Sequence, residues 1–246
     1  MKPLKKWLRY IFGDIITKPA ESPNAPSYLV KVVWFLRISI YFFGIYQLFK
    51  GETILGALIV ICVLFLVAPS AFTRSRITDI PLELEFFLFV MVFFQFVIGE
   101  AQGFYGTLSY YDNIMHFFFP FLISVMGFTI AYALFFSGKL KVSTGTMILF
   151  VIIVTLGIGA FWEIIEFLSD KYLLPNIDNW HRFQGTNAEN AITDTMDDLV
   201  NDLIGGIVGA VIASRYIIEA KYNKRMKELL KEIVKHFFGT RNLNKH

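Results

Sequence analysis

The chain has 246 residues, of which 55% are hydrophobic and 17% are charged, and its 23 Lys and Arg residues against 20 Asp and Glu residues give a net charge of +3. A typical soluble domain has about 45–50% apolar and about 25% charged residues. The composition therefore excludes a disordered chain and a nucleic-acid binder built on a basic surface. The single cysteine, Cys62, excludes an intramolecular disulfide and a cysteine-based metal site.

Residues 1–31 are predicted to form a cytoplasmic amphipathic segment and a linker. Lys5, Lys6 and Arg9 lie among apolar residues such as Trp7 and Ile11, a pattern typical of a helix on the inner leaflet. No small-residue cleavage site follows, so we do not expect a cleavable signal peptide. Three prolines between positions 19 and 26 indicate the linker.

Six apolar stretches follow, and each is predicted to be a transmembrane helix. A bilayer core about 30 Å thick needs about 20 apolar residues per helix. None of the stretches alternates with a period of two, which favours helices over a barrel. The sequence predicts an all-α polytopic membrane protein, a bundle of six transmembrane helices within residues 32–218. The stretches are residues 32–49, 53–69, 84–99, 115–136, 147–168 and 199–218.

The basic residues predict the orientation of these helices. Nineteen of the 23 Lys and Arg residues lie on the side shared by the two termini, three lie on the opposite side, and Arg37 lies within the first stretch. Because basic residues gather in cytoplasmic loops, we expect a multi-pass plasma-membrane protein with both termini in the cytoplasm. Residues 219–246 then form a basic cytoplasmic tail, with an amphipathic helix that ends near position 238.

Charged and polar residues within or beside the last four stretches gather on one side of the membrane. The predicted topology places all of them near the extracytoplasmic interface. Charged groups in a membrane are costly and usually face a bundle interior or a cavity, so we expect them to converge. They are Glu100 on the third stretch; Asp112 and His116 on the fourth; Glu163 and Glu166 on the fifth; and Asp194, Asp197, Asp198, Asn201 and Asp202 leading into the sixth.

The spacing of these residues indicates a shared metal site. Residues three or four positions apart share a helix face, which pairs Asp112 with His116 and Glu163 with Glu166. Carboxylates that are brought together must share protons or bind a cation. A histidine with carboxylates suits Zn²⁺, Mn²⁺ or Fe²⁺, and the oxygen-rich balance also suits Mg²⁺ or Ca²⁺. We predict a divalent metal site whose ligands are Asp112, His116, Glu163, Glu166, Asp194 and Asp198.

Small residues on the sixth stretch predict which way its acids point. Asp198 lies on the same helix face as Gly205, Gly209 and Ala213. Glycines four residues apart are typical of helices that pack closely in a membrane. The acids of this face are therefore expected to point at another helix, whereas Asp197 falls off the face and is expected to be solvated.

Structural roles for the same residues are the alternative. Asp112 and Asp194 are of a type that caps helix N-termini. His116 is as readily a structural histidine as a ligand, because imidazole finds partners of many kinds. Glu83 and Glu85, on the opposite side of the membrane, are interpreted as an interfacial charge group beside the arginines of the preceding loop.

Three short motifs contain the predicted ligands. They are Tyr111-Asp112-x-x-x-His116-Phe117, Trp162-Glu163-x-x-Glu166, and Asp194-Thr195-x-x-Asp198-Leu199 followed by Gly205. Together they resemble the motifs of a known family, the YjdF-like bacterial inner-membrane proteins. The resemblance covers about half the chain and implies that all six predicted ligands are family positions. The chain departs from the pattern before the last motif, where Thr193 stands in place of a tryptophan and the preceding Gly-Asp is missing. The resemblance implies a site and no particular reaction.

Three functions fit such a site. The first is a metal-dependent hydrolase of a lipid or lipid-linked substrate, in which Glu163 or Glu166 acts as general base. The second is a cation or proton-coupled transporter, since intramembrane carboxylates mark ion pathways. The third is a structural membrane protein with a metal-stabilised polar cluster. The expected partners are the lipid bilayer and a lipid substrate, without nucleic acid, and the sequence leaves the oligomeric state open.

Overall fold

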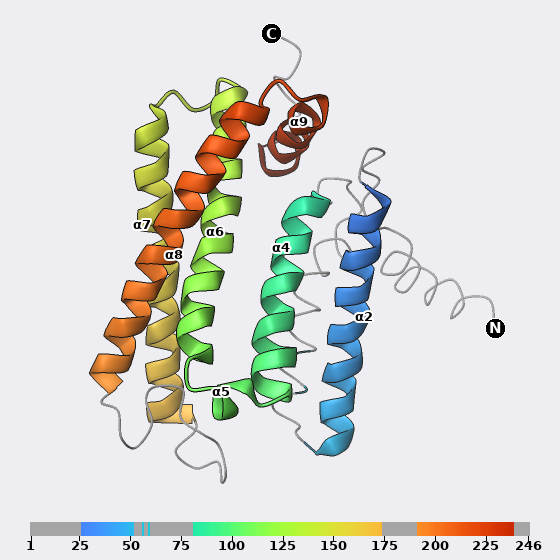
Figure 1. Ribbon diagram of the computed structural model, residues 1–246, viewed down its shortest axis with the longest axis vertical. Helices are drawn as coiled ribbons and strands as arrows, with labels where there is room; N and C mark the ends of the chain where they lie inside the picture. Colours follow the sequence, from blue (N-terminus) through green and yellow to red (C-terminus); the bar gives the residue numbers. More distant parts are fainter. Residues whose placement is uncertain (1–25, 52–55, 57–58, 60–80, 174–190, 239–246) are drawn as a thin grey trace, which may run out of the picture. The chain divides into compact units, whose positions relative to one another are not determined.

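A computed structural model of the chain describes residues 26–51, 56, 59, 81–173 and 191–238, most of which form helices (Figure 1). Five helical segments are long and apolar enough to cross a membrane, as an all-α polytopic protein requires. They correspond to five of the six predicted spans. Of the predicted span at 53–69 only Gly56 and Ile59 are described. Residues 1–25 of the predicted amphipathic segment and linker lie outside the described residues, and residues 27–31 belong to α2. The five segments are α2 (Ser27–Lys50), α4 (Leu82–Val92) with the π-helical η2 (Phe93–Ala101), α6 (Tyr111–Phe136), α7 (Thr144–Leu168) with η3 (Ser169–Leu173), and α8 (Ala191–Ala220).

The observed helices are longer than the apolar stretches that predicted them. Helix α6 begins at Tyr111 rather than at position 115, and α8 begins at Ala191 rather than at position 199. Both helices start with a polar turn, and the prediction missed these turns because it was based on runs of apolar residues. Asp112 and Asp198 therefore lie inside helices and have fixed directions.

The chain divides into two compact units, Met1–Leu108 with Asn223–His246, and Ser109–Tyr222. In the first unit, α2 packs against α4 and η2 around a core that includes Val33, Ile40 and Phe89. This unit also contains the short helix α5 (Phe104–Thr107) and helix α9 (Lys224–Phe238), in which Leu230, Ile233 and Val234 are buried.

Ion pairs connect helices within the described part of the first unit. Arg37 of α2, which sits between the rings of Trp34 and Phe89, pairs with Glu85 of α4. Glu83 accepts a hydrogen bond of 2.7 Å from the Arg225 guanidinium of α9. The described partners of these glutamates are therefore Arg37 and Arg225, while the loop arginines of the sequence-based interpretation lie outside the described residues.

The second unit is a three-helix bundle of α6, α7 and α8, which lie side by side (Figure 1). A Cβ atom at Gly205 or Gly209 would collide with the backbone carbonyl of Phe117 or Phe121, so α8 touches the backbone of α6 directly. The Ser124 hydroxyl donates a hydrogen bond of 2.7 Å to the Gly206 carbonyl across the same contact. The predicted close-packing face is thus present, and it fixes α8 against α6.

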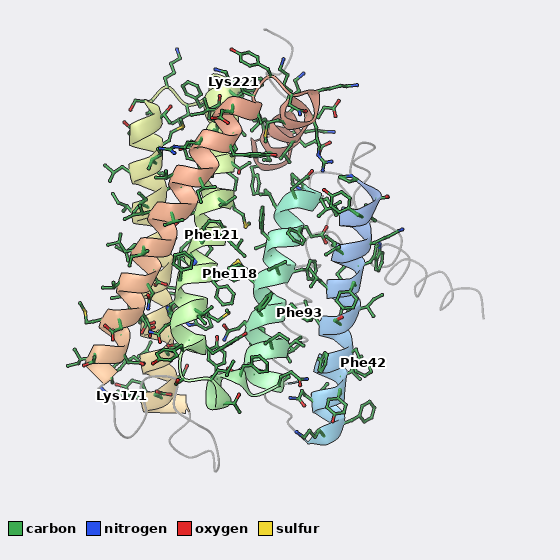
Figure 2. All side chains as sticks on the ribbon, viewed as in Figure 1. Phe42, Phe93, Phe118, Phe121, Lys171 and Lys221 are labelled. Atoms are coloured by element: carbon green, nitrogen blue, oxygen red, sulfur yellow. The ribbon has the colours of Figure 1, made fainter. Side chains whose placement is uncertain are left out.

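Apolar side chains cover the outside of this bundle. Phe150, Ile153 and Phe161 of α7 are each at least 60% exposed, a large apolar surface that a bilayer would cover. Lys171 and Lys221 lie at opposite ends of the bundle (Figure 2). The acidic residues lie toward the Lys171 end, where α6 and α8 begin and α7 finishes.

Candidate metal centre

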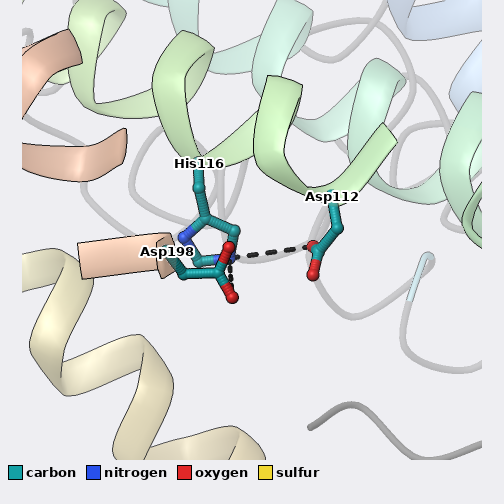
Figure 3. Close-up of side chains that lie close together, drawn as sticks. All are labelled: Asp112, His116 and Asp198. Carbon is teal, nitrogen blue, oxygen red and sulfur yellow. Dashed lines mark ion pairs between the residues drawn. The ribbon is translucent and has the colours of Figure 1, made fainter. Parts of the chain in front are cut away.

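His116 is the centre of the polar cluster, and it lies one turn into α6. Its Nε2 atom is 3.8 Å from Asp112 Oδ1 of the same helix, 3.6 Å from Glu163 Oε1 of α7 and 4.0 Å from Asp198 Oδ2 of α8. Figure 3 shows Asp112 and Asp198 approaching the ring from two helices. One imidazole nitrogen therefore faces carboxylates from all three helices of the bundle.

The other ring nitrogen of His116 has a partner of its own. Its Nδ1 atom lies 3.1 Å from Asp202 Oδ1, within hydrogen-bond distance. Asp202 is one turn along α8 from Asp198 and is only 1% exposed. An ideal Cβ at Gly159 of α7 would collide with the Asp202 carboxylate, so the glycine leaves the space in which Asp202 lies.

Glu166 lies one turn from Glu163 near the end of α7. The indole Nε1 of Trp162 donates a hydrogen bond of 2.7 Å to Glu166 Oε1, which orients the carboxylate. Glu166 is 8% exposed and Glu163 is 3% exposed. Both acids are therefore buried beside His116, and the Trp162 bond distinguishes the environment of Glu166 from that of Glu163.

The geometry of these residues fits a divalent cation. Asp112, His116 and Asp198 form one group whose ligand atoms lie within 4.8 Å of one another, and His116, Glu163 and Glu166 form a second. Two ligand atoms that share an ion at about 2.1 Å each lie at most about 4.2 Å apart. The three measured separations from Nε2 are below this limit. Asp198 Oδ2 is buried and has no hydrogen-bond partner among the described residues, which an ion would supply.

The charge balance of the bundle also favours a cation. Helices α6 and α7 contain no Lys or Arg, and α8 has none before Arg215. Buried carboxylates are costly unless they are paired, protonated or bound to a metal. Imidazole and carboxylate together suit Zn²⁺, Mn²⁺ or Fe²⁺, and the excess of oxygen also suits Mg²⁺.

Five of the six predicted ligands lie in the two groups, and the sixth does not. Asp194 is half-buried in the first turn of α8 and belongs to neither group. Glu100 of the third predicted span lies in the first unit, and the two groups described here come from α6, α7 and α8 of the second unit. The loop after α7, including His181, lies outside the described residues. Asp197 is exposed, as its position off the packing face predicts.

The capping alternative fails for Asp112. The residue that precedes α6 is Tyr110, which makes no side-chain capping bond, and Asp112 is already helical. Asp202 was among the residues expected to converge, but it was not one of the six predicted ligands. Its signal was present, since it follows Asp198 by four residues and precedes Gly205 by three.

Comparisons with known proteins identify a family but not an activity. A family model described as "Predicted membrane protein (DUF2238)" matches residues 29–219, which include the whole cluster. A protein of Thermotoga maritima described as "Uncharacterized protein" is 26% identical over 129 residues, which is 52% of this chain and 60% of that relative. The chain therefore spans less than two thirds of the relative's length. No solved structure matches the chain. The narrower YjdF-like resemblance stays a prediction.

Proposed function

The chain belongs to this family of predicted membrane proteins, and we propose that it is a membrane-embedded, metal-dependent hydrolase of a lipid or lipid-linked substrate. One observation carries the proposal. A single imidazole nitrogen faces carboxylates from three helices, of which α6 and α7 contain no Lys or Arg and α8 has none before Arg215. Such an arrangement is expensive to maintain without a cation.

The residues divide into ligands and a base. His116, Asp112, Asp198 and Glu163 are the proposed ligands, because their atoms surround Nε2. Glu166 is the proposed general base, because Trp162 holds its carboxylate beside the ligands and the second oxygen remains for a water.

The proposed reaction is hydrolysis of a phosphoester or ester. A bound divalent cation would polarise the phosphoryl or acyl oxygen and make a coordinated water more acidic. Glu166 would take a proton from the attacking water, whose oxygen would form a bond to phosphorus or to the acyl carbon. The bond to the leaving alcohol then breaks, and the alcohol oxygen takes the proton back from Glu166.

The position of the cluster supports a lipid substrate. The site lies at one end of a bundle whose outer surface is apolar, and the protein is embedded in a bilayer. Asp112 is the most accessible proposed ligand, with a side chain that is 35% exposed. The distribution of basic residues favours the extracytoplasmic leaflet, with both termini in the cytoplasm. A headgroup or lipid-linked phosphoester would then reach the cluster past Asp112.

Metal content and turnover together test the proposal. The metal in detergent-purified wild type, Glu163→Gln, Asp198→Asn and Glu166→Gln would be measured by ICP-MS, with Asp197→Asn as an exposed control on the same helix. We expect stoichiometric metal in the wild type, in the control and in Glu166→Gln, and loss in the two ligand variants. Hydrolysis of phospholipid and lipid-linked phosphoesters should disappear in Glu166→Gln. An active Glu166→Gln protein would refute the assigned base.

A structural role is the second candidate, and one observation favours it. Glu163 and Asp198 are 3% and 2% exposed, as expected for a metal that only ties helices together. Chelation would then lower stability, and no substrate would be turned over. Transport is less supported, because α6 after His116 and α7 before Glu163 contain no Asp, Glu, Lys, Arg or His to continue a pathway. Cation flux through the protein in proteoliposomes would favour transport over the structural role.

A further inference from the structure

We propose that Asp202 is the positioning residue of the cluster. It holds the His116 ring so that Nε2 faces the cation, and Gly159 provides the space for its carboxylate. The inference rests on the proposed function, because it assigns a role within the same site. It adds a residue on α8 and a residue on α7 that the set of predicted ligands does not contain.

The hydrogen bond to Nδ1 decides which ring nitrogen serves as the ligand. In the tautomer that carries its proton on Nδ1, His116 donates a hydrogen bond of 3.1 Å to Asp202 Oδ1. The proton on Nδ1 leaves the Nε2 lone pair for a cation. Histidine ligands commonly donate their second ring N–H to a carboxylate, which fixes the tautomer and the ring orientation.

The packing of α8 against α6 sets the register of this bond. Gly205, three residues after Asp202, lies directly against the carbonyl of Phe117, which follows His116 in the chain. This backbone contact leaves no freedom to slide α8 along α6. Asp202 is therefore held opposite the His116 ring by the helix interface, and it is 1% exposed there.

Gly159 of α7 leaves the space that the Asp202 carboxylate occupies. An ideal Cβ at this position would collide with Asp202 Oδ2 and would lie 2.6 Å from its Cγ. Asp202 Oδ2 is buried and has no hydrogen-bond partner among the described residues. The oxygen is thus accommodated by the missing side chain of Gly159 and not by a bond, while Oδ1 serves His116.

Zinc affinity in matched variants tests the role of Asp202. Full-length protein in detergent would be titrated with Zn²⁺ against a chromophoric chelator, comparing wild type, Asp202→Ala, Asp202→Asn and Ser124→Ala. We expect Asp202→Ala to bind Zn²⁺ about 10–100-fold more weakly. The Zn²⁺ affinity of Asp202→Asn should lie between those of the wild type and Asp202→Ala, because the amide oxygen still accepts a hydrogen bond from Nδ1. Ser124→Ala removes a hydrogen bond from the same helix interface and should leave the affinity unchanged.

A spectroscopic measurement separates positioning from a general loss of structure. Nitrogen-15 NMR of histidine-labelled, Zn²⁺-loaded protein reports which ring nitrogen carries a proton, and His116→Gln identifies the signal. We expect a protonated Nδ1 that exchanges slowly with water in the wild type and in Ser124→Ala. In Asp202→Ala the same proton should exchange faster. A residue that only stabilised the bundle would leave this proton unaffected.

The outcomes distinguish this inference from the proposed function. Wild-type affinity in Asp202→Ala, or an equal loss in Ser124→Ala, would overturn the positioning role and leave the hydrolase proposal standing. A wild-type protein that binds no Zn²⁺ would overturn both. Binding that depends on Asp202, without hydrolysis of any lipid substrate, would support the positioning role and count against the hydrolase.

Discussion

A methyl group added at Gly159 probes the geometry of the cluster without removing any ligand. The new Cβ would lie 2.6 Å from Asp202 Cγ, whereas carbon atoms pack at about 3.5–4.0 Å. The carboxylate would therefore have to retreat by about 1 Å. Gly157, two residues earlier on α7, has nothing within 4 Å of its ideal Cβ and provides a matched control.

The expected magnitude follows from the difference between the two positions. Both substitutions share the gain of about 0.5–1 kcal/mol that alanine has over glycine inside a helix. Only Gly159→Ala adds overpacking, which costs about 1–3 kcal/mol. Gly159→Ala should therefore be about 1–3 kcal/mol less stable than Gly157→Ala. Displacement of Asp202 should also weaken Zn²⁺ binding about 10-fold or more, in the first variant alone.

Two measurements check this prediction. Unfolding by SDS in mixed micelles, followed by tryptophan fluorescence, gives the difference in stability. Chelator competition gives the Zn²⁺ affinities. Equal stabilities and equal affinities for the two variants would show that position 159 is as open as position 157, and would refute the packing argument around Asp202.

Three further predictions concern charge and metal. Burial and the neighbouring Glu83 and Glu228 raise the pKa of Glu232 in α9 above its ordinary value of 4.5. The folded state then retains a proton that the unfolded state releases, so stability should fall as the pH rises from 4.5 through the raised pKa. Thermal unfolding at a series of pH values should show this fall in stability, and Glu232→Gln should remove the part of the pH dependence that Glu232 contributes. Arg37→Met leaves Glu85 as a buried charge and should cost about 3–5 kcal/mol, measured by chemical unfolding. Adding Glu85→Leu should restore most of the loss, and a double variant as unstable as the single one would contradict the ion pair. Chelation by EDTA should lower the free energy of unfolding by about 2.7 kcal/mol relative to protein at a free Zn²⁺ concentration 100 times Kd. An unchanged unfolding midpoint would argue against a bound metal.

Hydropathy and helical spacing predicted much of this architecture. The apolar stretches located five membrane helices, and the spacing of Gly205 and Gly209 predicted the face on which α8 meets α6. The predicted starts of α6 and α8 came too late in the sequence, because each helix begins with a polar turn, which in α6 contains Asp112. Hydropathy measures the apolar part of a helix, whereas backbone hydrogen bonding continues through its charged first turn.

The individual contacts at the cluster were beyond the reach of the sequence. Residue spacing brings Asp198 and Asp202 to one face, but it does not say which of them meets which nitrogen of His116. That choice depends on the register between α6 and α8, which a backbone contact at Gly205 determines. The importance of Gly159 was likewise invisible, because a glycine in a helix shows nothing about its neighbour until the neighbouring helix is in place.

The distance along the chain between the members of the cluster has a consequence for biosynthesis. His116 and Asp202 are 86 residues apart, and α6 and α7 are synthesised before α8. Transmembrane helices insert first and associate afterwards. A nascent chain that has not yet added α8 therefore carries Asp112, Glu163 and Glu166 in the bilayer before Asp198 and Asp202 arrive. The cluster is completed only when α8 joins α6 and α7, so its assembly marks a bundle in which all three helices are present.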